Sequence, residues 1–340
     1  MIMKWPTYKR RFFNRAKAEG FNKDYIKQCL DYAYNLFTRN LPIIYDQEHV
    51  SLLVGYNLSY LLRASNKPDA FYREFEILKK NGGKRKISEP LPSLKEIQRW
   101  ILDNILYKCE VSRFAKAFIP SKSIKENARF HRGQRLVLSL DIKDFFSSIK
   151  FDKVYSLYKS IGYSKSVAVL LAKLSTLNNC LPQGAPTSPA LSNLISHRID
   201  KRFSSFAIKN KVRYTRYADD ITFSGNFNVG NLIRLATCVL DDEKLSLNQS
   251  KTRLMMKHQK QEVTGIVVNE KLQAPRALRR KVRQEVYYIN KYGLDSHLNA
   301  IGSTRANYIE HLKGLVQFVI FVNEKDTEFC EYLKYLKEYT

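Results

Sequence analysis

Tyr217-Ala218-Asp219-Asp220 sets two adjacent carboxylates inside a short stretch that is otherwise aromatic and apolar. Residues 214–217 lead into this pair and residues 221–224 lead out of it, with the composition of two strands joined by a tight turn. Like charges this close raise each other's pKa unless a cation lies between them. Mg²⁺ removes that repulsion and prefers hard oxygen ligands. The stretch therefore predicts a metal site at a turn between two strands.

A second acidic pair, Asp241-Asp242, shows the same dipeptide in an ordinary setting. It follows apolar residues from Leu232 to Leu240 at the spacing of an amphipathic helix. We therefore expect this pair to lie at an exposed helix end and to bind no metal. Context, rather than the dipeptide itself, singles out Asp219 and Asp220.

A third carboxylate, Asp141, ends the apolar run of residues 136–140 and is followed by Phe145 and Phe146. An Asp at the carboxyl end of a buried strand points out of the sheet edge, where a site can form. If this strand lies beside the 214–224 hairpin, the three carboxylates meet. They would then hold two Mg²⁺ ions, one activating a hydroxyl and one stabilising a leaving pyrophosphate. Taken alone, Asp141 is more commonly a strand-ending turn residue.

With these residues in view, the chain resembles a reverse transcriptase, and specifically the bacterial retron reverse transcriptases. The resemblance spans roughly residues 70–270, with a weaker echo to about residue 322. Its blocks, in chain order, are Phe71-Tyr72-Arg73-Glu74-Phe75-Glu76-Ile77, Lys79-Lys80-Asn81-Gly82-Gly83-Lys84-Arg85-Lys86-Ile87, Leu94-Lys95-Glu96-Ile97-Gln98-Arg99-Trp100-Ile101, residues 141–146, Leu181-Pro182-Gln183-Gly184-Ala185-Pro186-Thr187-Ser188-Pro189 and residues 217–220. Two short elements, Asn127-Ala128-Arg129-Phe130-His131 and Val263-Thr264-Gly265, match elements that separate retrons from other bacterial reverse transcriptases.

The resemblance implies an α+β fold arranged as a right-hand polymerase. Residues 1–65 read as a helical amino-terminal extension, residues 66–270 as fingers and palm with an antiparallel sheet plus helices, and residues 271–340 as a basic helical thumb. Within the fingers, Asn81-Gly82-Gly83 predicts a tight hairpin turn. Ser93 and Glu96 read as a capping box that starts the next helix.

The same resemblance assigns roles to residues around the predicted site. Asp141, Asp219 and Asp220 become the catalytic metal ligands. Phe146 becomes the aromatic ring that closes the sugar pocket against a ribose 2′-hydroxyl, although an isolated Phe is more often a core residue. Gln183, in a Pro-Gln-Gly turn whose backbone can approach a ligand closely, would lie beside the base and sugar of the incoming nucleotide.

Three basic residues are predicted to contact the nucleotide's phosphates. Lys84 and Arg85 follow the fingers turn, where the family clamps the triphosphate, and Arg85 is favoured because a guanidinium binds phosphate bidentately. Lys251 matches a family lysine that protonates the leaving pyrophosphate or stabilises its charge. The plainer interpretation of all three is an exposed surface cation.

Retron-specific RNA contact or scaffolding is the role considered for Asn127 and His131. The thumb supplies further candidates for binding the phosphates of a structured RNA by shape, with a solvated cationic face as the alternative. These candidates are Arg276, Arg279, Arg280 and Arg283.

Bulk composition agrees with a nucleic-acid partner. The formal charge is +26, from 58 Lys plus Arg against 32 Asp plus Glu, which favours binding to a polyanion. We expect no membrane partner, because no apolar run approaches the length of a spanning helix. The five scattered cysteines form no zinc or disulfide pattern, so we expect a cytoplasmic protein.

The leading interpretation is a retron-type RNA-directed DNA polymerase using deoxynucleoside triphosphates and Mg²⁺, with Mn²⁺ as a substitute. The resemblance implies that it copies part of a cognate structured non-coding RNA, primed from an RNA 2′-hydroxyl, into short DNA that remains branched to the RNA. It also implies antiphage defence with a separate effector protein. The alternatives are a nucleoprotein scaffold that restrains an effector and another bacterial enzyme of the group II intron-like or diversity-generating type. An RNA-templated RNA polymerase is disfavoured by Phe146 and Ala218.

Overall fold

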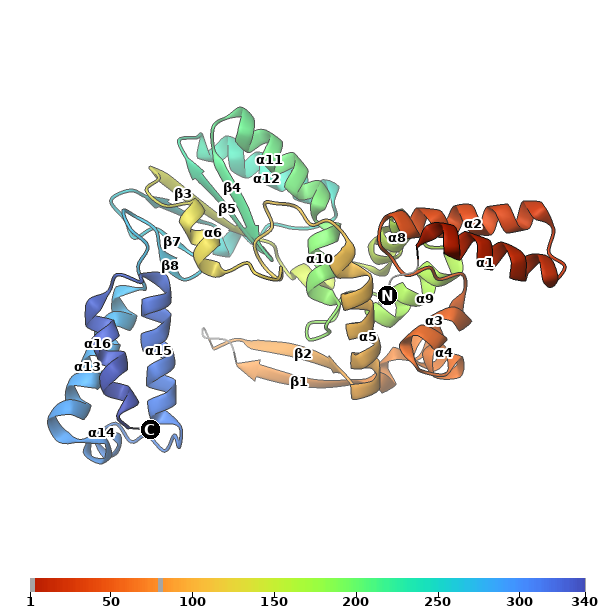
Figure 1. The fold of residues 1–340 in the computed structure, drawn as a ribbon. Coiled ribbons are helices and arrows are strands. Elements are labelled where there is room, and N and C mark those ends of the chain that lie inside the picture. Colours follow the sequence, from red (N-terminus) through yellow and green to blue (C-terminus); the bar gives the residue numbers. More distant parts are fainter. Residues whose placement is uncertain (1–3, 79–81, 340) are drawn as a thin grey trace. The chain divides into compact units, whose positions relative to one another are not determined.

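The computed structural model describes residues 4–78 and 82–339, and their fold is α+β (Figure 1). The chain forms two compact units, each assembled from separate segments of the sequence. The first comprises the chain up to residue 113 with residues 143–201 and 239–246, and the second comprises residues 114–142, 202–238 and 247 onward. The division predicted at residues 65 and 270 stays a prediction.

The amino-terminal part of the first unit is helical. Helix α1 buries no side chain completely, and it is attached through aromatic rings: Trp5 lies 4.9 Å from Tyr34 and 5.4 Å from Phe37, and Phe12 lies 5.6 Å from Tyr45, between centroids. The basic side chains of α1 are therefore exposed to solvent. The helices here are α1 (Trp5–Ala18), α2 (Lys23–Thr38), α3 (Gln47–Val54) and α4 (Leu58–Asn66), followed by the 3-10 turn η1 (Pro68–Phe71).

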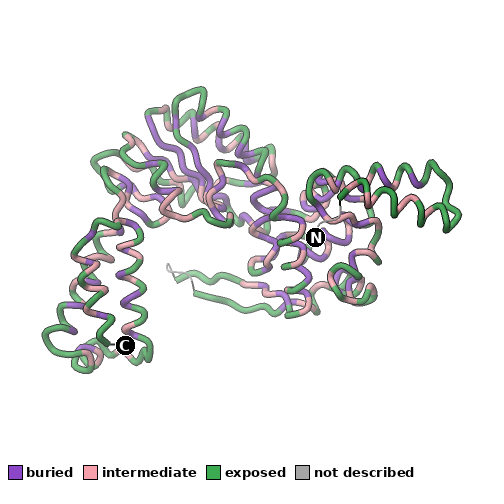
Figure 2. Tube along the Cα trace, in the orientation of Figure 1, coloured by how far each residue is buried: buried purple, intermediate pink, exposed green. Residues whose placement is uncertain are grey.

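A hairpin follows, formed by the antiparallel strands β1 (Tyr72–Leu78) and β2 (Lys84–Pro90). Asn81, in the predicted turn, lies outside the described residues. Strand β1 is exposed after Tyr72, whereas β2 is exposed only in its first three residues and becomes buried toward Pro90 (Figure 2). The two faces of this hairpin are described below by the cross-strand pairs on each face.

Helix α5 (Pro92–Asn104) begins directly after β2, with Leu91 as its N-cap and no capping side chain. The capping box predicted from Ser93 and Glu96 is therefore wrong. Proline suits the first helical position because it has no N–H to leave unpaired, and it starts the helix before Ser93. The other elements of this part of the fold are η2 (Leu106–Lys108), α7 (Phe145–Ser148), α8 (Phe151–Ile161), α9 (Lys165–Ser175), α10 (Ser188–Ile195) and α11 (His197–Lys209), the last of which continues into the second unit.

An antiparallel sheet with strand order β4-β5-β3-β6 lies at the centre of the second unit. Its core is aromatic: the Phe203 ring of α11 meets Tyr214 and Phe223 edge-on, at 5.5 and 5.4 Å between centroids. The purple strands in Figure 2 mark this buried centre. The elements are β3 (Leu136–Asp141), β4 (Arg213–Tyr217), β5 (Asp220–Gly225) and β6 (Arg253–Met256), with α6 (Ile124–Phe130), α12 (Val229–Asp242), η3 (Gln249–Lys251) and the small hairpin β7 (Glu262–Val263) and β8 (Ile266–Val267).

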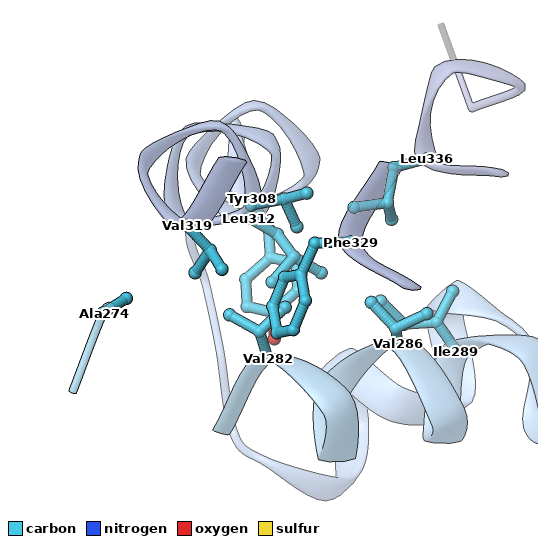
Figure 3. Close-up of a cluster of buried hydrophobic side chains, with 10 residues drawn as sticks. Ala274, Val282, Val286, Ile289, Tyr308, Leu312, Val319, Phe329 and Leu336 are labelled. Carbon is cyan, nitrogen blue, oxygen red and sulfur yellow. The ribbon is translucent and has the colours of Figure 1, made fainter. Parts of the chain in front are cut away.

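The carboxyl-terminal helices pack around a core of their own, drawn in Figure 3. Val282, Leu312 and Phe329 come from three different helices and are fully buried there. A second cluster includes Val322 together with Ala128 and residues of β3 and the β7–β8 hairpin, so these helices are anchored to the sheet. They are α13 (Arg276–Tyr292), α14 (Leu294–Ala300), α15 (Tyr308–Val322) and α16 (Thr327–Lys337).

Asp241 and Asp242 are exposed at the end of α12, which confirms the helix-end prediction for this pair. Among residues 4–78 and 82–339, no helix combines the length and apolar character needed to cross a bilayer.

Candidate active site

The three predicted carboxylates come from adjacent strands of the central sheet. Asp141 is the last residue of β3 and is paired across the sheet with Asp220, the first residue of β5. Asp220 is also paired with Tyr217 on β4, so the turn between these strands consists of Ala218 and Asp219. The backbone N–H of Ile142 donates to the Asp219 carbonyl at 3.0 Å. The sheet register thus brings all three carboxylates to one edge.

The turn that carries Asp219 has a strained backbone. Ala218 has φ +58°, a left-handed conformation that a residue with a Cβ adopts only at a cost of about 1–2 kcal/mol. The buried Arg216 side chain donates through Nη1 to the Ala218 carbonyl at 3.2 Å. This fully buried guanidinium supports the turn, and sequence reasoning missed it, because an arginine between Thr215 and Tyr217 reads as an exposed strand residue.

Negative charge accumulates at this edge. Burial, together with the carboxylates of Asp219 and Asp141, raises the pKa of Asp220 to about 6. Lys251 partly neutralises this charge. Its Nζ donates to both carboxylate oxygens of Asp141 at 3.0 Å. That hydrogen bond raises the pKa of the Lys251 ammonium, so the group stays protonated. The predicted pyrophosphate lysine therefore contacts the acid edge directly.

Asn248 is a further residue that sequence reasoning missed. Its backbone N–H donates to the Asp141 carbonyl at 2.8 Å, and its side-chain amide donates to Asp141 Oδ1 at 3.1 Å. These two bonds fix both the backbone and the carboxylate of Asp141. The available signal was the position of Asn248 three residues before Lys251, in the same short segment as η3.

The donor set suits Mg²⁺, since carboxylate oxygens are its preferred protein ligands. Burial first, and then the neighbouring carboxylates of Asp219 and Asp141, raise the pKa of Asp220, and the cations of Lys251 and Arg253 oppose this shift. Within the described residues, no group of three or more His, Cys, Asp or Glu side chains is arranged so that it could hold a metal ion. The metal role of Asp141, Asp219 and Asp220 therefore stays a prediction.

Phe146 and Gln183 belong to the first unit, so they are described within it. Phe146 is half-buried in α7, beside the buried Phe145 at 5.6 Å between ring centroids. Gln183 accepts a hydrogen bond through its carbonyl from the Ser88 N–H at 2.8 Å. Gly184 has φ +130°, and a Cβ there would lie 2.8 Å from the Ser88 carbonyl oxygen. The Pro-Gln-Gly loop is therefore seated against β2 by a contact that only glycine permits.

Lys84 and Arg85 project from opposite faces of the fingers hairpin, since neighbouring strand residues alternate. Lys84 is 2.7 Å from the Glu76 carboxylate. Arg85 is exposed and lies opposite Ile77, on the face that also carries the Phe75–Ile87 pair. The hairpin thus separates the two candidates, with Lys84 balanced by an acid and Arg85 on the apolar face.

Known proteins similar to this chain are reverse transcriptases. Residues 77–268 match the model of the reverse transcriptase (RNA-dependent DNA polymerase) family. The retron Mx65 reverse transcriptase of Myxococcus xanthus is 34% identical, over 94% of this chain and 78% of the relative. The chain belongs to the retron reverse transcriptase family. A second relative, the retron Ec86 reverse transcriptase of Escherichia coli, is 30% identical over 86% of this chain and 89% of its own length.

Membership confirms the resemblance drawn from the motifs, together with the α+β polymerase fold, and makes the protein an RNA-directed DNA polymerase. Among solved structures, a telomerase from Candida albicans in complex with a telomeric RNA fragment aligns with 78% of this chain and 56% of its own, at 13% identity and a TM-score of 0.46. That likeness is too weak to bear on function.

The first of the two elements that the resemblance assigns to retrons places two polar side chains in the interior. Asn127 and His131 are both fully buried, at 0% exposure. His131 contacts Thr215 and Ser224 on the central strands, each at 2.7 Å. A side chain in this position cannot touch RNA without unfolding its surroundings. Of the two roles considered for Asn127 and His131, the geometry supports scaffolding, and the RNA-binding assignment is corrected.

The four arginines predicted to bind RNA, Arg276, Arg279, Arg280 and Arg283, divide into two pairs. Arg279 donates to Asp326 at 2.8 Å, and Arg283 donates to the Glu328 carboxylate through Nε and Nη2. Both guanidinium groups also lie over the Phe329 ring. These contacts hold α16 against α13, and the RNA-binding role of Arg279 and Arg283 stays a prediction. Arg276 and Arg280 are exposed on α13, and their RNA-binding role stays a prediction.

Proposed function

We propose that this retron reverse transcriptase copies part of a cognate structured non-coding RNA into short single-stranded DNA, primed from a 2′-hydroxyl of that RNA. The product is then a branched RNA–DNA molecule. The observation that carries the proposal is the pairing of Asp141 with Asp220 at the sheet edge, beside Asp219. The motif resemblance supports the RNA-primed step, and by the same resemblance the complex acts in antiphage defence with a separate effector protein.

The chain's own residues have distinct tasks in this proposal. Asp141, Asp219 and Asp220 would hold two Mg²⁺ ions, for which Mn²⁺ would substitute; bound there, they would supply activation of the attacking hydroxyl and charge neutralisation for the leaving pyrophosphate. Asn248 holds the Asp141 carboxylate in orientation. Lys251 keeps its proton because of Asp141, so it supplies a cation beside the acid edge and a proton for the departing pyrophosphate.

The residues to which we assign nucleotide binding and selection belong to the first unit. We assign Arg85 to the triphosphate, Gln183 to the base and sugar, and Phe146 to the exclusion of a ribose 2′-hydroxyl. The half-buried ring of Phe146 is supported from behind by Phe145, which suits a rigid wall. Phe146→Val should raise incorporation of ribonucleotides relative to deoxynucleotides, while Phe145→Leu should leave the ratio unchanged. An unchanged ratio in Phe146→Val would remove the gate from the proposal.

RNA phosphates have two exposed basic surfaces available. Arg276 and Arg280 form one on α13. The outer side of α1 forms the other, where five cations are exposed and no acidic residue lies within the helix: Lys9, Arg10, Arg11, Arg15 and Lys17. Neutralising three of the α1 cations should lower the salt dependence of RNA binding by about 2–3 in log–log slope. An unchanged slope would leave α1 as a solvated face.

The deciding experiment expresses the protein in its native operon context and extracts the nucleic acid bound to it, for wild type and for Asp219→Ala/Asp220→Ala. Separate ribonuclease and deoxyribonuclease digests identify the product. A discrete short DNA joined to RNA, absent from the variant, supports the proposal. RNA alone in both samples would favour the nucleoprotein scaffold, and heterogeneous DNA without attached RNA would refute retron synthesis.

A further inference from the structure

Five polar side chains form a continuous series of hydrogen bonds that links α6 and the β7–β8 turn to the strands β4 and β5. His131 Nδ1 lies 2.7 Å from Ser224 Oγ, and His131 Nε2 lies 2.7 Å from Thr215 Oγ1. Thr215 donates to Asn127 Oδ1 at 2.6 Å, and Asn127 Nδ2 donates to Thr264 Oγ1 at 3.4 Å. We call this set the motif chain, because it joins Asn127 and His131 of one retron element to Thr264 of the other.

The number of hydrogens on each group determines which group donates and which accepts in each bond of the motif chain. The single hydroxyl hydrogen of Thr215 goes to Asn127, so Thr215 must accept from the Nε2–H of His131. His131 Nδ1 is then an acceptor and receives the Ser224 hydroxyl. Burial, with the nearby Arg213 cation as a lesser cause, lowers the pKa of His131 to about 3, which agrees with a neutral ring. Each donor thus has one acceptor, and removing one member leaves a buried partner unsatisfied.

The far end of the motif chain holds a strained turn. Thr264 and Gly265 both have positive φ, at +49° and +80°, and they form the two-residue turn between β7 and β8. This is the pattern of a type I′ turn, for which Asn-Gly is preferred. A β-branched residue costs more there, but the Thr264 hydroxyl accepts from Asn127 and donates to the Ile124 carbonyl at 3.4 Å. The side chain that strains the turn therefore also ties it to α6.

The near end of the motif chain lies on the strands that carry the acid pair. Thr215 is two residues before Tyr217, where β4 ends, and Ser224 is four residues after Asp220, where β5 begins. One imidazole ring therefore bridges the two strands that lead into and out of the acid turn. Helix α6 contacts β4, β7 and β8, so the motif chain runs from the strained turn through α6 to both catalytic strands.

We propose that Asn127, His131 and Thr264 are positioning residues that act as one unit, fixing the β4–β5 hairpin so that Asp219 and Asp220 meet Asp141 at the distance two metal ions require. This inference rests on the proposed metal role of those carboxylates. In this proposal, none of the three residues has a direct role in binding substrate or metal. They act on the rate through the rigidity of the hairpin and leave nucleotide binding alone, because the nucleotide-binding residues of the proposal lie outside the motif chain.

The test replaces hydroxyl groups while keeping side-chain shape. Thr215→Val and Thr264→Val are made singly and together, with Thr215→Ser as the conservative rescue. Thr176→Val is the matched control, a buried threonine of the other unit whose hydroxyl donates to the Ala172 carbonyl. The kcat, the KM for dTTP and the Mg²⁺ concentration giving half-maximal rate are measured on poly(rA)·oligo(dT), at a temperature where circular dichroism shows every variant folded.

We expect Thr215→Val to lower kcat by about tenfold or more and to raise the Mg²⁺ requirement several-fold, with the KM for dTTP unchanged. Thr215→Ser should recover most of the rate, and Thr176→Val should resemble wild type. The double variant Thr215→Val/Thr264→Val should be less than multiplicatively impaired, since both changes break the same unit.

Three outcomes would overturn the proposal. Loss of thermal stability with kcat and Mg²⁺ dependence unchanged would make the motif chain a purely structural feature. A raised KM for dTTP at constant kcat would put these residues in substrate binding. Fully multiplicative effects would mean that the two retron elements act separately. Failure of the proposed function is distinguished from these by Asp219→Ala/Asp220→Ala, whose retained activity would refute the metal role whatever the threonine variants do.

Discussion

Replacing Asp220 by Asn should stabilise this protein in the absence of divalent metal while abolishing DNA synthesis. Burial and the carboxylates of Asp219 and Asp141 raise the pKa of Asp220 from 3.8 to about 6. At about 1.4 kcal/mol per pH unit, the fold disfavours the ionised side chain by about 3 kcal/mol. Asn has the shape of the protonated acid without its charge, so the variant should gain about 2–3 kcal/mol of unfolding free energy at pH 7.5.

The stability difference between Asp220→Asn and wild type should depend on pH. Because the folded-state pKa lies above the unfolded one, the folded protein binds more protons between pH 4 and 6, and its stability falls as pH rises through that window. Above about pH 7 the loss is complete. The stability difference between Asp220→Asn and wild type should therefore be close to zero near pH 4, grow up to about pH 7 and then remain constant.

Urea unfolding in the presence of a chelator, at several pH values from 4.5 to 8, measures this difference. Asp241→Asn is the matched control, because Asp241 is an exposed carboxylate at the end of α12; its effect should be small at every pH. Adding Mg²⁺ should then stabilise wild type more than Asp220→Asn. A variant that is less stable than wild type at pH 7.5, or a gain that does not depend on pH, would refute the electrostatic argument.

Three further changes test other parts of the fold. Arg85→Ala should raise the KM for deoxynucleotides about tenfold and Lys84→Ala less than twofold, because Lys84 already faces an acid; single-nucleotide incorporation kinetics measure both, and equal effects would contradict the assignment. Gly184→Ala should destabilise by more than 1 kcal/mol, since its Cβ would meet a backbone oxygen at 2.8 Å, and an unchanged Tm would contradict the close approach. Arg279→Met should cost about 3 kcal/mol by leaving a buried carboxylate unpaired, against less than about 0.5 kcal/mol for the exposed Arg276→Met; similar urea midpoints would show that the ion pair contributes little.

The acid edge could be predicted from sequence because local patterns determine it. An apolar run that ends at Asp141 and a strand–turn–strand around Asp219 and Asp220 fix where each carboxylate leaves the sheet. Chain order and family resemblance then supplied the pairing of the strands. Lys251 followed from the same motif series, and its contact with Asp141 agrees with a role beside the acid edge.

Features that depend on distant residues could not be predicted in this way. Arg279 and Arg283 read as an RNA-binding face because their partners, Asp326 and Glu328, lie more than forty residues along the chain. For His131 the sequence left RNA contact and scaffolding both open, because the strand hydroxyl groups that it contacts come from β4 and β5. In each case the local sequence shows a polar group, while only the tertiary structure shows which partner it has.

Two turns of this chain have a strained backbone, and each is supported by a buried polar side chain. Ala218 and Thr264 both adopt positive φ at positions of a two-residue hairpin turn, where glycine or asparagine would cost less. Each is held by a buried polar side chain, Arg216 at the acid turn and Asn127 at the other. Arg216 follows directly after Thr215, and Thr215 is the hydrogen-bond partner of Asn127. One short strand therefore carries the support for both turns, so a change in β4 should disturb the acid pair and the retron-specific turn together.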